Sequence, residues 1–294
     1  MEVLFLKMLK DFYDTIKQSK RREALWKEEE IQKYDANGDT LLTYAVCDEN
    51  LEMVNFLLEK SFSPMAKNLY GVTPLIISAQ IDNISILERL FPLCVNDLNL
   101  EDIACLYANA SYYGCTRNIQ YLMNYSPVKD VMFQGDSILH WSINSGNVET
   151  VKLVLSITSD LNVQNEDGMT PIYNACAEGE LDIVKLLLSQ NADVNIPSYS
   201  GCTPLGIAVC YGHTAIVELL LKHHANPETR DLDGLTPLLY SIKYNKIDIF
   251  ELLLKSSIKT DVVDNNLHGF HFYVNPNYVN RYISLMIKYG YNPI

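Results

Sequence analysis

The feature that most constrains the fold of this chain is an internal sequence repeat. Residues 165–197 and 198–230 align with one another over their whole length without a gap, and we call the length of either segment the repeat length. The matched pairs are Gly168 with Gly201, Thr170-Pro171 with Thr203-Pro204, Gly179 with Gly212, and Leu186-Leu187-Leu188 with Leu219-Leu220-Leu221. A segment this short cannot bury its apolar side chains alone. A chain of such repeats is therefore expected to stack them along one axis around a shared core.

A glycine marks the start of most repeats. It stands at Gly38, Gly71, Gly135, Gly168, Gly201 and Gly234. Each step equals the repeat length, except the step from 71 to 135. That step is slightly shorter than two repeat lengths and leaves room for a degenerate repeat at 101–131. A last, divergent repeat contains Gly269 and is interpreted as a C-terminal cap. The predicted repeats are 35–67, 68–100, 101–131, 132–164, 165–197, 198–230, 231–264 and 265–294.

The residues around each glycine predict a tight turn followed by a helix. In Gly234-Leu235-Thr236-Pro237 the glycine suits the positive φ of a hairpin turn. The threonine can cap the helix, and proline is tolerated in its first turn. A second helix follows, whose apolar face in the fifth repeat is Ile183, Val184, Leu187 and Leu188. The first, third and last repeats lack the Thr-Pro pair, so we expect weaker caps there, each costing about 1 kcal/mol.

The period of the repeat and the Thr-Pro-Leu segment resemble the ankyrin repeat, whose signature is Thr-Pro-Leu-His-x-Ala. The sixth repeat carries Thr203-Pro204-Leu205 with Ala208, and His140 stands at the histidine position of the fourth. The resemblance implies an all-α solenoid of helix-turn-helix units joined by short β-hairpin loops, over residues 35–294. Residues 1–34 are predicted to form an N-terminal helical cap, because Phe5, Leu9 and Ile16 follow a helical spacing.

Charge and composition limit the classes of partner. The formal net charge is −13, with 36 acidic and 23 basic side chains, which disfavours nucleic acid and anionic membranes. No apolar run is long enough to span a membrane, and the N-terminus lacks the pattern of a secretion signal. Seven cysteines without a C-x-x-C pair are typical of free thiols in a reducing compartment. We therefore expect a cytoplasmic monomer.

The sequence contains none of the common catalytic motifs. G-x-S-x-G, G-x-x-x-x-G-K and H-E-x-x-H are all absent. The histidine cluster of His213, His223 and His224 is explained by helix ends, where a cation is favourable. We predict no catalytic residue, no cofactor and no metal, and therefore no enzyme. Chemistry on the surface of the repeats is kept as a minor alternative.

Proteins of the ankyrin family usually contact partners through hairpin tips and the ends of the first helices, which line a concave face. Carried to this sequence, these positions hold many aromatic and acidic side chains, which is typical of interaction sites. We expect a protein partner with an apolar centre and a basic rim. The predicted binding residues are Leu69, Tyr70, Val72, Ile81, Tyr112, Tyr113, Phe133, Asp136, Glu166, Asp167, Met169, Glu178, Tyr199, Tyr211, Leu232, Asp233, Leu235 and Tyr244.

Two further hypotheses follow from the resemblance. Many bacterial or viral effectors delivered into eukaryotic cells are built from ankyrin repeats, and the Ile, Asn, Lys and Tyr usage fits an A·T-rich genome. In that case the chain would sequester or redirect a host protein in the host cytosol. Separately, Asp193-Val194-Asn195 resembles the site that an asparaginyl hydroxylase modifies in ankyrin repeats, which makes Asn195 a candidate for hydroxylation.

Overall fold

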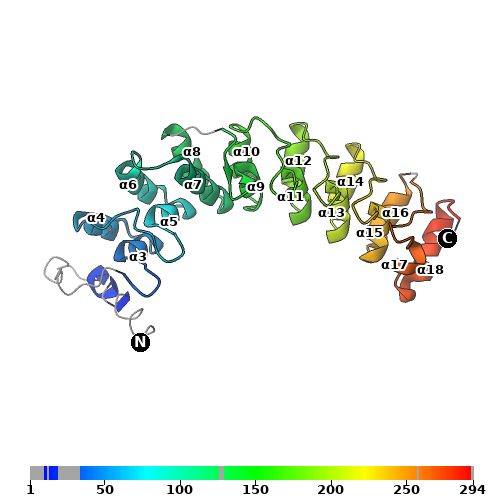
Figure 1. Ribbon diagram of the computed structural model, residues 1–294, viewed down its shortest axis with the longest axis horizontal. Coiled ribbons are helices and arrows are strands. Elements are labelled where there is room, and N and C mark those ends of the chain that lie inside the picture. Colours follow the sequence, from blue (N-terminus) through cyan, green and yellow to red (C-terminus); the bar gives the residue numbers. More distant parts are fainter. Residues whose placement is uncertain (1–9, 12, 19–33, 126–128, 257, 293–294) are drawn as a thin grey trace. The chain divides into compact units, whose positions relative to one another are not determined.

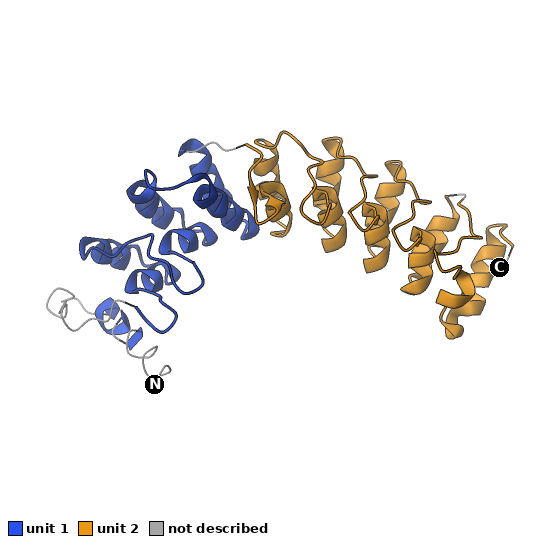
Figure 2. Cartoon of the chain, in the orientation of Figure 1, with its two compact units in different colours: residues 1–128 blue, residues 129–294 orange. Residues whose placement is uncertain are grey.

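The computed structural model describes residues 10–11, 13–18, 34–125, 129–256 and 258–292. These residues fall into two compact units, Met1–Val128 (unit 1) and Lys129–Ile294 (unit 2), as Figure 2 shows. Residues 10–11 and 13–18 are helical, and Tyr13 and Ile16 are buried. The other positions predicted for the N-terminal cap, including Phe5 and Leu9, lie outside the described residues. The boundaries of the predicted domain and its repeats remain predictions.

Unit 1 contains three helix pairs in chain order. Within this unit, first helices pack on first helices and second helices on second helices (Figure 1). The helices are α3 (Leu41–Cys47), α4 (Leu51–Glu59), α5 (Pro74–Gln80), α6 (Ile84–Cys94), α7 (Leu100–Tyr112) and α8 (Thr116–Tyr125).

Unit 2 continues the same pattern after one short hairpin. Strands β1 (Met132–Phe133) and β2 (Asp136–Ser137) are antiparallel, with Met132 opposite Ser137 and Phe133 opposite Asp136. The first helices are α9 (Ile138–Ile143), α11 (Pro171–Glu178), α13 (Pro204–Tyr211), α15 (Pro237–Lys243) and α17 (Phe270–Tyr273). The second helices are α10 (Val148–Leu155), α12 (Leu181–Ser189), α14 (Thr214–Lys222), α16 (Ile247–Leu254) and α18 (Val279–Lys288), the last preceded by a 3-10 turn, η2 (Pro276–Tyr278).

Shared apolar faces hold the helix pairs together. The predicted face of α12 is confirmed, because Ile183, Val184, Leu187 and Leu188 are all buried. Each fully buried side chain of this size contributes about 1.5–3 kcal/mol relative to an exposed one. Since α12 packs on α10 and α14 as well as on α11, this stabilisation depends on neighbouring repeats. The all-α architecture expected from the repeat is therefore present.

The caps of the first helices differ from the prediction. The first and third repeats are capped without a Thr-Pro pair, so the expectation of weak ends there was wrong. Thr40 forms a capping box with Thr43, and Asn99 forms one with Asp102. In the last repeat, Gly269 precedes α17 and no side chain caps the helix. The prediction from the Thr-Pro pair failed because several short polar residues can accept the same amide hydrogen bond.

At Gly168 the hairpin turn needs glycine for two reasons. Its φ is +74°, and a Cβ at this position would overlap Cδ1 of Tyr199 and lie 2.6 Å from the backbone nitrogen of the same residue. The next hairpin thus approaches the turn too closely for a side chain. In the last repeat Leu267 stands one repeat length after Gly234 and has φ +65° without being glycine. This backbone conformation is unfavourable for leucine.

Comparing Gly168→Ala with Gly71→Ala separates these two reasons. Gly71 has φ +76°, but a Cβ there would meet no atom within 4 Å. We expect Gly71→Ala to lose about 1–2 kcal/mol from backbone strain alone, and Gly168→Ala to lose clearly more because Tyr199 must move. Equilibrium unfolding in urea measures both. Equal losses in the two variants would contradict the close-approach argument.

Candidate protein-binding surface

Neighbouring hairpins are joined by one recurring backbone hydrogen bond. In unit 2 the amides of Tyr199, Leu232 and Asn265 each donate to a carbonyl of the preceding hairpin at 2.9 Å. In unit 1 the amide of Leu69 donates to the carbonyl of Asn37 at 2.8 Å. Successive donors in unit 2 are separated by one repeat length. These bonds fix the spacing of the hairpin tips that they join.

An aspartate, half-buried as Asp231 in the seventh repeat and buried as Asp264 in the last, holds the base of the hairpin. Asp231 Oδ1 accepts hydrogen bonds from the amides of Asp233 at 3.0 Å and Leu235 at 2.7 Å, and Oδ2 accepts one from the Tyr240 hydroxyl. In the last repeat, Tyr273 donates to Asp264 at 2.5 Å. Burial opposes ionisation of Asp264, but hydrogen bonds from Tyr273 and two backbone amides outweigh it and lower its pKa to about 2. In these two repeats the carboxylate therefore ties the turn to the first helix.

Two rows of exposed side chains lie on this framework in unit 2. We call Glu166, Asp167, Tyr199, Leu232 and Asp233 the tip row, and Glu178, Tyr211 and Tyr244 the helix-end row. Tyr199 is 66% exposed, Leu232 71% and Tyr211 60%, which is high for side chains of this kind. Tyr240 links the rows in the seventh repeat, because its hydroxyl donates to Asp231 and its ring stacks on Tyr244 with centroids 6.1 Å apart.

Unit 1 exposes a second set of predicted residues. Leu69 and Tyr70 stand at the tip of the second hairpin and are 76% and 77% exposed. Tyr112 and Tyr113 lie at the end of α7 with their rings edge to face, 5.2 Å apart. Both tyrosines are exposed.

The prediction is wrong for one of the binding residues. Leu235 is only 3% exposed, because the residue after the turn glycine points toward the helices. Its amide bonds to Asp231, and Cys202 at the equivalent position is also buried. The remaining predicted residues are half-buried and offer less contact area. They are Val72, Ile81, Phe133, Asp136 and Met169.

Exposed apolar residues that were not predicted from the sequence lie in the last repeat, and two of them are near its turn. Leu267 is 80% exposed and Phe272 is 62% exposed. The ring of Phe272 stacks on His268 with centroids 3.7 Å apart and an angle of 5°. The turn at Leu267 lies one repeat length after Gly234, whereas the sequence prediction places the marker of this repeat at Gly269.

A Ser-His pair lies in the fourth repeat, but it is buried. Ser137 Oγ lies 2.7 Å from His140 Nδ1, and His140 Nε2 lies 3.0 Å from the carbonyl oxygen of Met169. A carbonyl can only accept, so Nε2 carries the proton and Nδ1 accepts from the serine hydroxyl. Burial lowers the pKa of His140, partly offset by the hydrogen bond to Met169. With both side chains inaccessible, the pair caps α9 and bonds to the next hairpin.

The cysteines are all free thiols. Burial raises the pKa of Cys94, Cys115 and Cys202 to about 11 and that of Cys210 to about 12, which disfavours the nucleophilic thiolate. Within the described ranges, no group of three or more His, Cys, Asp or Glu side chains is placed to hold a metal ion. None of the helices that the structure describes is long and apolar enough to cross a membrane.

Asn195 is exposed, but its side chain joins two loops. The amide of Asn226 donates to Asn195 Oδ1 at 2.8 Å, and Asn195 Nδ2 donates to the carbonyl of His224 at 3.3 Å. Asn162 and Glu228 stand one repeat length before and after Asn195, and each accepts an equivalent hydrogen bond from a backbone amide of the following loop. The asparagine thus has a structural role, and its hydroxylation remains a prediction.

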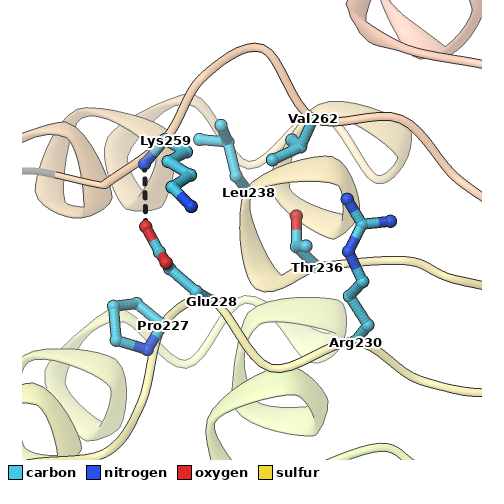
Figure 3. Close-up of a pocket in the computed structure, with 7 residues that line it drawn as sticks. All are labelled: Pro227, Glu228, Arg230, Thr236, Leu238, Lys259 and Val262. Atoms are coloured by element: carbon cyan, nitrogen blue, oxygen red, sulfur yellow. Dashed lines mark hydrogen bonds between the residues drawn. The ribbon is translucent and has the colours of Figure 1, made fainter.

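A small pocket lies beside the loop after α14. Its volume is about 150 Å³, below the roughly 300–1,000 Å³ of most small-molecule sites. Glu228 Oε1 accepts the amide hydrogen bond of Lys259 at 3.1 Å across it (Figure 3). None of its lining residues is a predicted binding residue. They are Pro227, Glu228, Arg230, Thr236, Leu238, Lys259 and Val262.

Comparison with known proteins identifies the family. A family model of ankyrin repeats, built from three copies, matches residues 14–102, 105–198, 156–231 and 197–266. The chain therefore belongs to the ankyrin repeat family, whose repeats are protein-interaction modules.

Two relatives match shorter segments. A putative ankyrin repeat protein of fowlpox virus is 28% identical over 141 residues, which cover 47% of this chain and 24% of that protein. Protein phosphatase 1 regulatory subunit 27 of mouse is 40% identical over 45 residues, which cover 15% of this chain and 29% of that protein. The chain thus covers less than a third of either relative.

The buried histidine predicts a specific pH dependence. Because burial lowers the pKa of His140 below its ordinary 6.5, the unfolded chain binds this proton more readily than the folded chain. The contribution of His140 to stability should be complete above about pH 6.5 and fall as the pH drops below it.

His140→Gln keeps an Nε2 donor for Met169 and cannot be protonated. Urea unfolding between pH 7.5 and 5 should show a steeper loss for the natural chain than for His140→Gln. Parallel curves would contradict the prediction.

Proposed function

We propose that this chain is a non-enzymatic scaffold that binds a protein partner through the tip row and the helix-end row of unit 2. The observation that carries the proposal is the exposure of Tyr199, Tyr211 and Leu232 on elements fixed by backbone hydrogen bonds. Rigid tyrosines provide large contact area at a low cost in conformational entropy. Side chains whose backbone is already ordered lose little further freedom when a partner binds.

The charges beside these side chains indicate the chemistry of the partner. Glu166 and Asp167 are exposed in the tip row next to Tyr199, and Asp233 is exposed next to Leu232. Carboxylates around an apolar centre favour basic side chains at the rim of the partner, mainly by steering association and rejecting acidic surfaces. We therefore infer a partner surface with apolar residues in the middle and Lys or Arg around them.

A second candidate is a role in a host cell as a delivered effector. The likeness to a fowlpox virus ankyrin repeat protein supports it, although it covers only 47% of this chain. In this role the same two rows would capture a host protein. A tagged chain produced by its source and giving no signal in host cytosol would contradict delivery.

The scaffold proposal predicts that variants of the two rows lose a partner. A variant with Tyr199→Ala, Tyr211→Ala, Glu166→Lys and Asp167→Lys should retain its fold, because all four side chains are exposed. Truncated tyrosine hot spots typically cost about 2 kcal/mol or more each. Capture of the partner, quantified by mass spectrometry, should therefore fall at least about tenfold.

The matched control changes exposed charges on the second helices instead. Asp182→Lys and Glu218→Lys alter α12 and α14 by charge reversal but leave both rows intact. This control should retain the partner. Retention by the four-site variant, or equal loss in the control, would show that the rows do not bind it.

A further inference from the structure

One position beside the helix-end row is filled by side chains of different charge in successive repeats of unit 2. Glu180, His213 and Lys246 stand one repeat length apart, each immediately before a second helix. Each lies over the loop glycine of the preceding repeat, where a Cβ would come within 2.5–3.2 Å of an atom of the side chain. These glycines are Gly146, Gly179 and Gly212. The three side chains therefore occupy equivalent places between neighbouring repeats.

The chemistry at this position changes along the unit. His213 Nε2 donates a hydrogen bond to the carbonyl of Ala177 at 3.1 Å, and Lys246 Nζ donates one to the carbonyl of Tyr211 at 3.1 Å. The carboxylate of Glu180 can only accept hydrogen bonds, so it cannot make this contact. It also places a negative charge near the C-terminal end of α9, where the helix dipole favours a cation. The charge at this position therefore changes from negative in the fifth repeat to positive in the seventh.

The exposed ends of the first helices show the same change of sign. Helix α11 ends at the exposed Glu178, and α15 ends at the exposed Lys243. Lys243 Nζ lies 5.7 Å from the ring centroid of Tyr244. Within the described ranges, neither these two charges nor those of Glu180 and Lys246 are neutralised by an ion pair.

The helix-end row therefore has a negative end and a positive end. Helices α11, α13 and α15 pack side by side in this order (Figure 1), and Tyr211 ends the middle one. Because packed helix axes are about 8–10 Å apart, the opposite charges are separated by about 16–20 Å. The tip row shows no such change of sign, since its charged residues are all acidic. They are Glu166, Asp167 and Asp233.

We propose that the partner lies along the helix-end row as a linear segment of opposite polarity. A Lys or Arg of the segment binds at Glu178 and Glu180. An apolar side chain packs on Tyr211, and an Asp or Glu binds at Lys243 and Lys246. Charge complementarity selects this occupant, because a segment with the same charge at both ends is repelled at one end of the row. The inference rests on the proposed function and refines it, since the rim of the partner becomes acidic over the seventh repeat.

The test uses linear peptides as the probe. A segment that spans about 16–20 Å needs about 5–6 residues if it is extended and about 11–13 if it is helical. A displayed library of random peptides of about 16 residues covers both forms. It is selected on the full chain, and the enriched peptides are synthesised and titrated. We expect them to carry a basic and an acidic residue on opposite sides of an apolar centre. Tyr211→Ala should weaken their binding at least about tenfold.

Reversing one charge at a time tests the polarity itself. Glu178→Lys should weaken binding of the enriched peptides at least about fivefold, and changing the basic residue of the peptide to Glu should restore it. Lys243→Glu should act in the same way at the other end, and changing the acidic residue of the peptide to Lys should restore binding. Both side chains are exposed, so the variants should keep the melting temperature of the natural chain. The matched controls, Asp182→Lys and Lys185→Glu, make the same charge changes on the exposed face of α12 and should leave binding unchanged.

Several results would overturn the proposal. They are enrichment of no peptide, enrichment of peptides with the same charge at both ends, equal loss in the matched controls, and binding that survives Tyr211→Ala. Peptides that depend on Tyr211 but on neither charge would also overturn the polarity, yet they would leave the scaffold proposal standing. Failure of the scaffold proposal is measured separately, by partner capture with the four-site variant.

Discussion

The stacking of the hairpins depends on one recurring backbone hydrogen bond, in which the amide of Leu69, Tyr199, Leu232 or Asn265 donates to a carbonyl of the preceding hairpin. It forms at 2.9 Å for Tyr199, Leu232 and Asn265 in unit 2. The bond is possible only where the turn allows close approach, which is why the ring and backbone of Tyr199 lie against Gly168. Tip side chains are then free to vary, because none of them is needed to make the bond. A rigid framework with variable tips is suited to recognising a protein surface.

The helix ends show how different residues meet one physical requirement. The last carbonyls of a helix have no partner within the helix. His213 Nε2 donates to the carbonyl of Ala177 at 3.1 Å, and Lys246 Nζ donates to that of Tyr211 at 3.1 Å. In unit 1 the side-chain amide of Asn118 donates to three carbonyls at the end of α5. In each case the following repeat supplies the donor, so a repeat is completed by its neighbour.

Periodicity predicted much of this fold because it reports backbone requirements. The glycine at Gly168 was expected in a turn and has positive φ, and the apolar face of α12 is buried as its spacing indicated. Side-chain direction was less predictable. Leu235 was expected at the surface but points into the core. The repeat signature gave no signal where a residue outside the signature meets a backbone requirement. Leu267 does so in its turn, and Asn99 does so before α7.

The central claim is that hydrogen-bonded hairpins hold the tip side chains in fixed positions. Amide hydrogen exchange measured residue by residue by NMR tests it directly. The amides of Tyr199, Leu232 and Asn265 donate between hairpins, whereas those of Glu166 and Ser200 donate no backbone hydrogen bond to a residue the structure describes. The account predicts that the first three exchange on the order of 100-fold more slowly than the other two, after correction for intrinsic rates. Equal exchange in both groups would show that the hairpins move independently, and would contradict it.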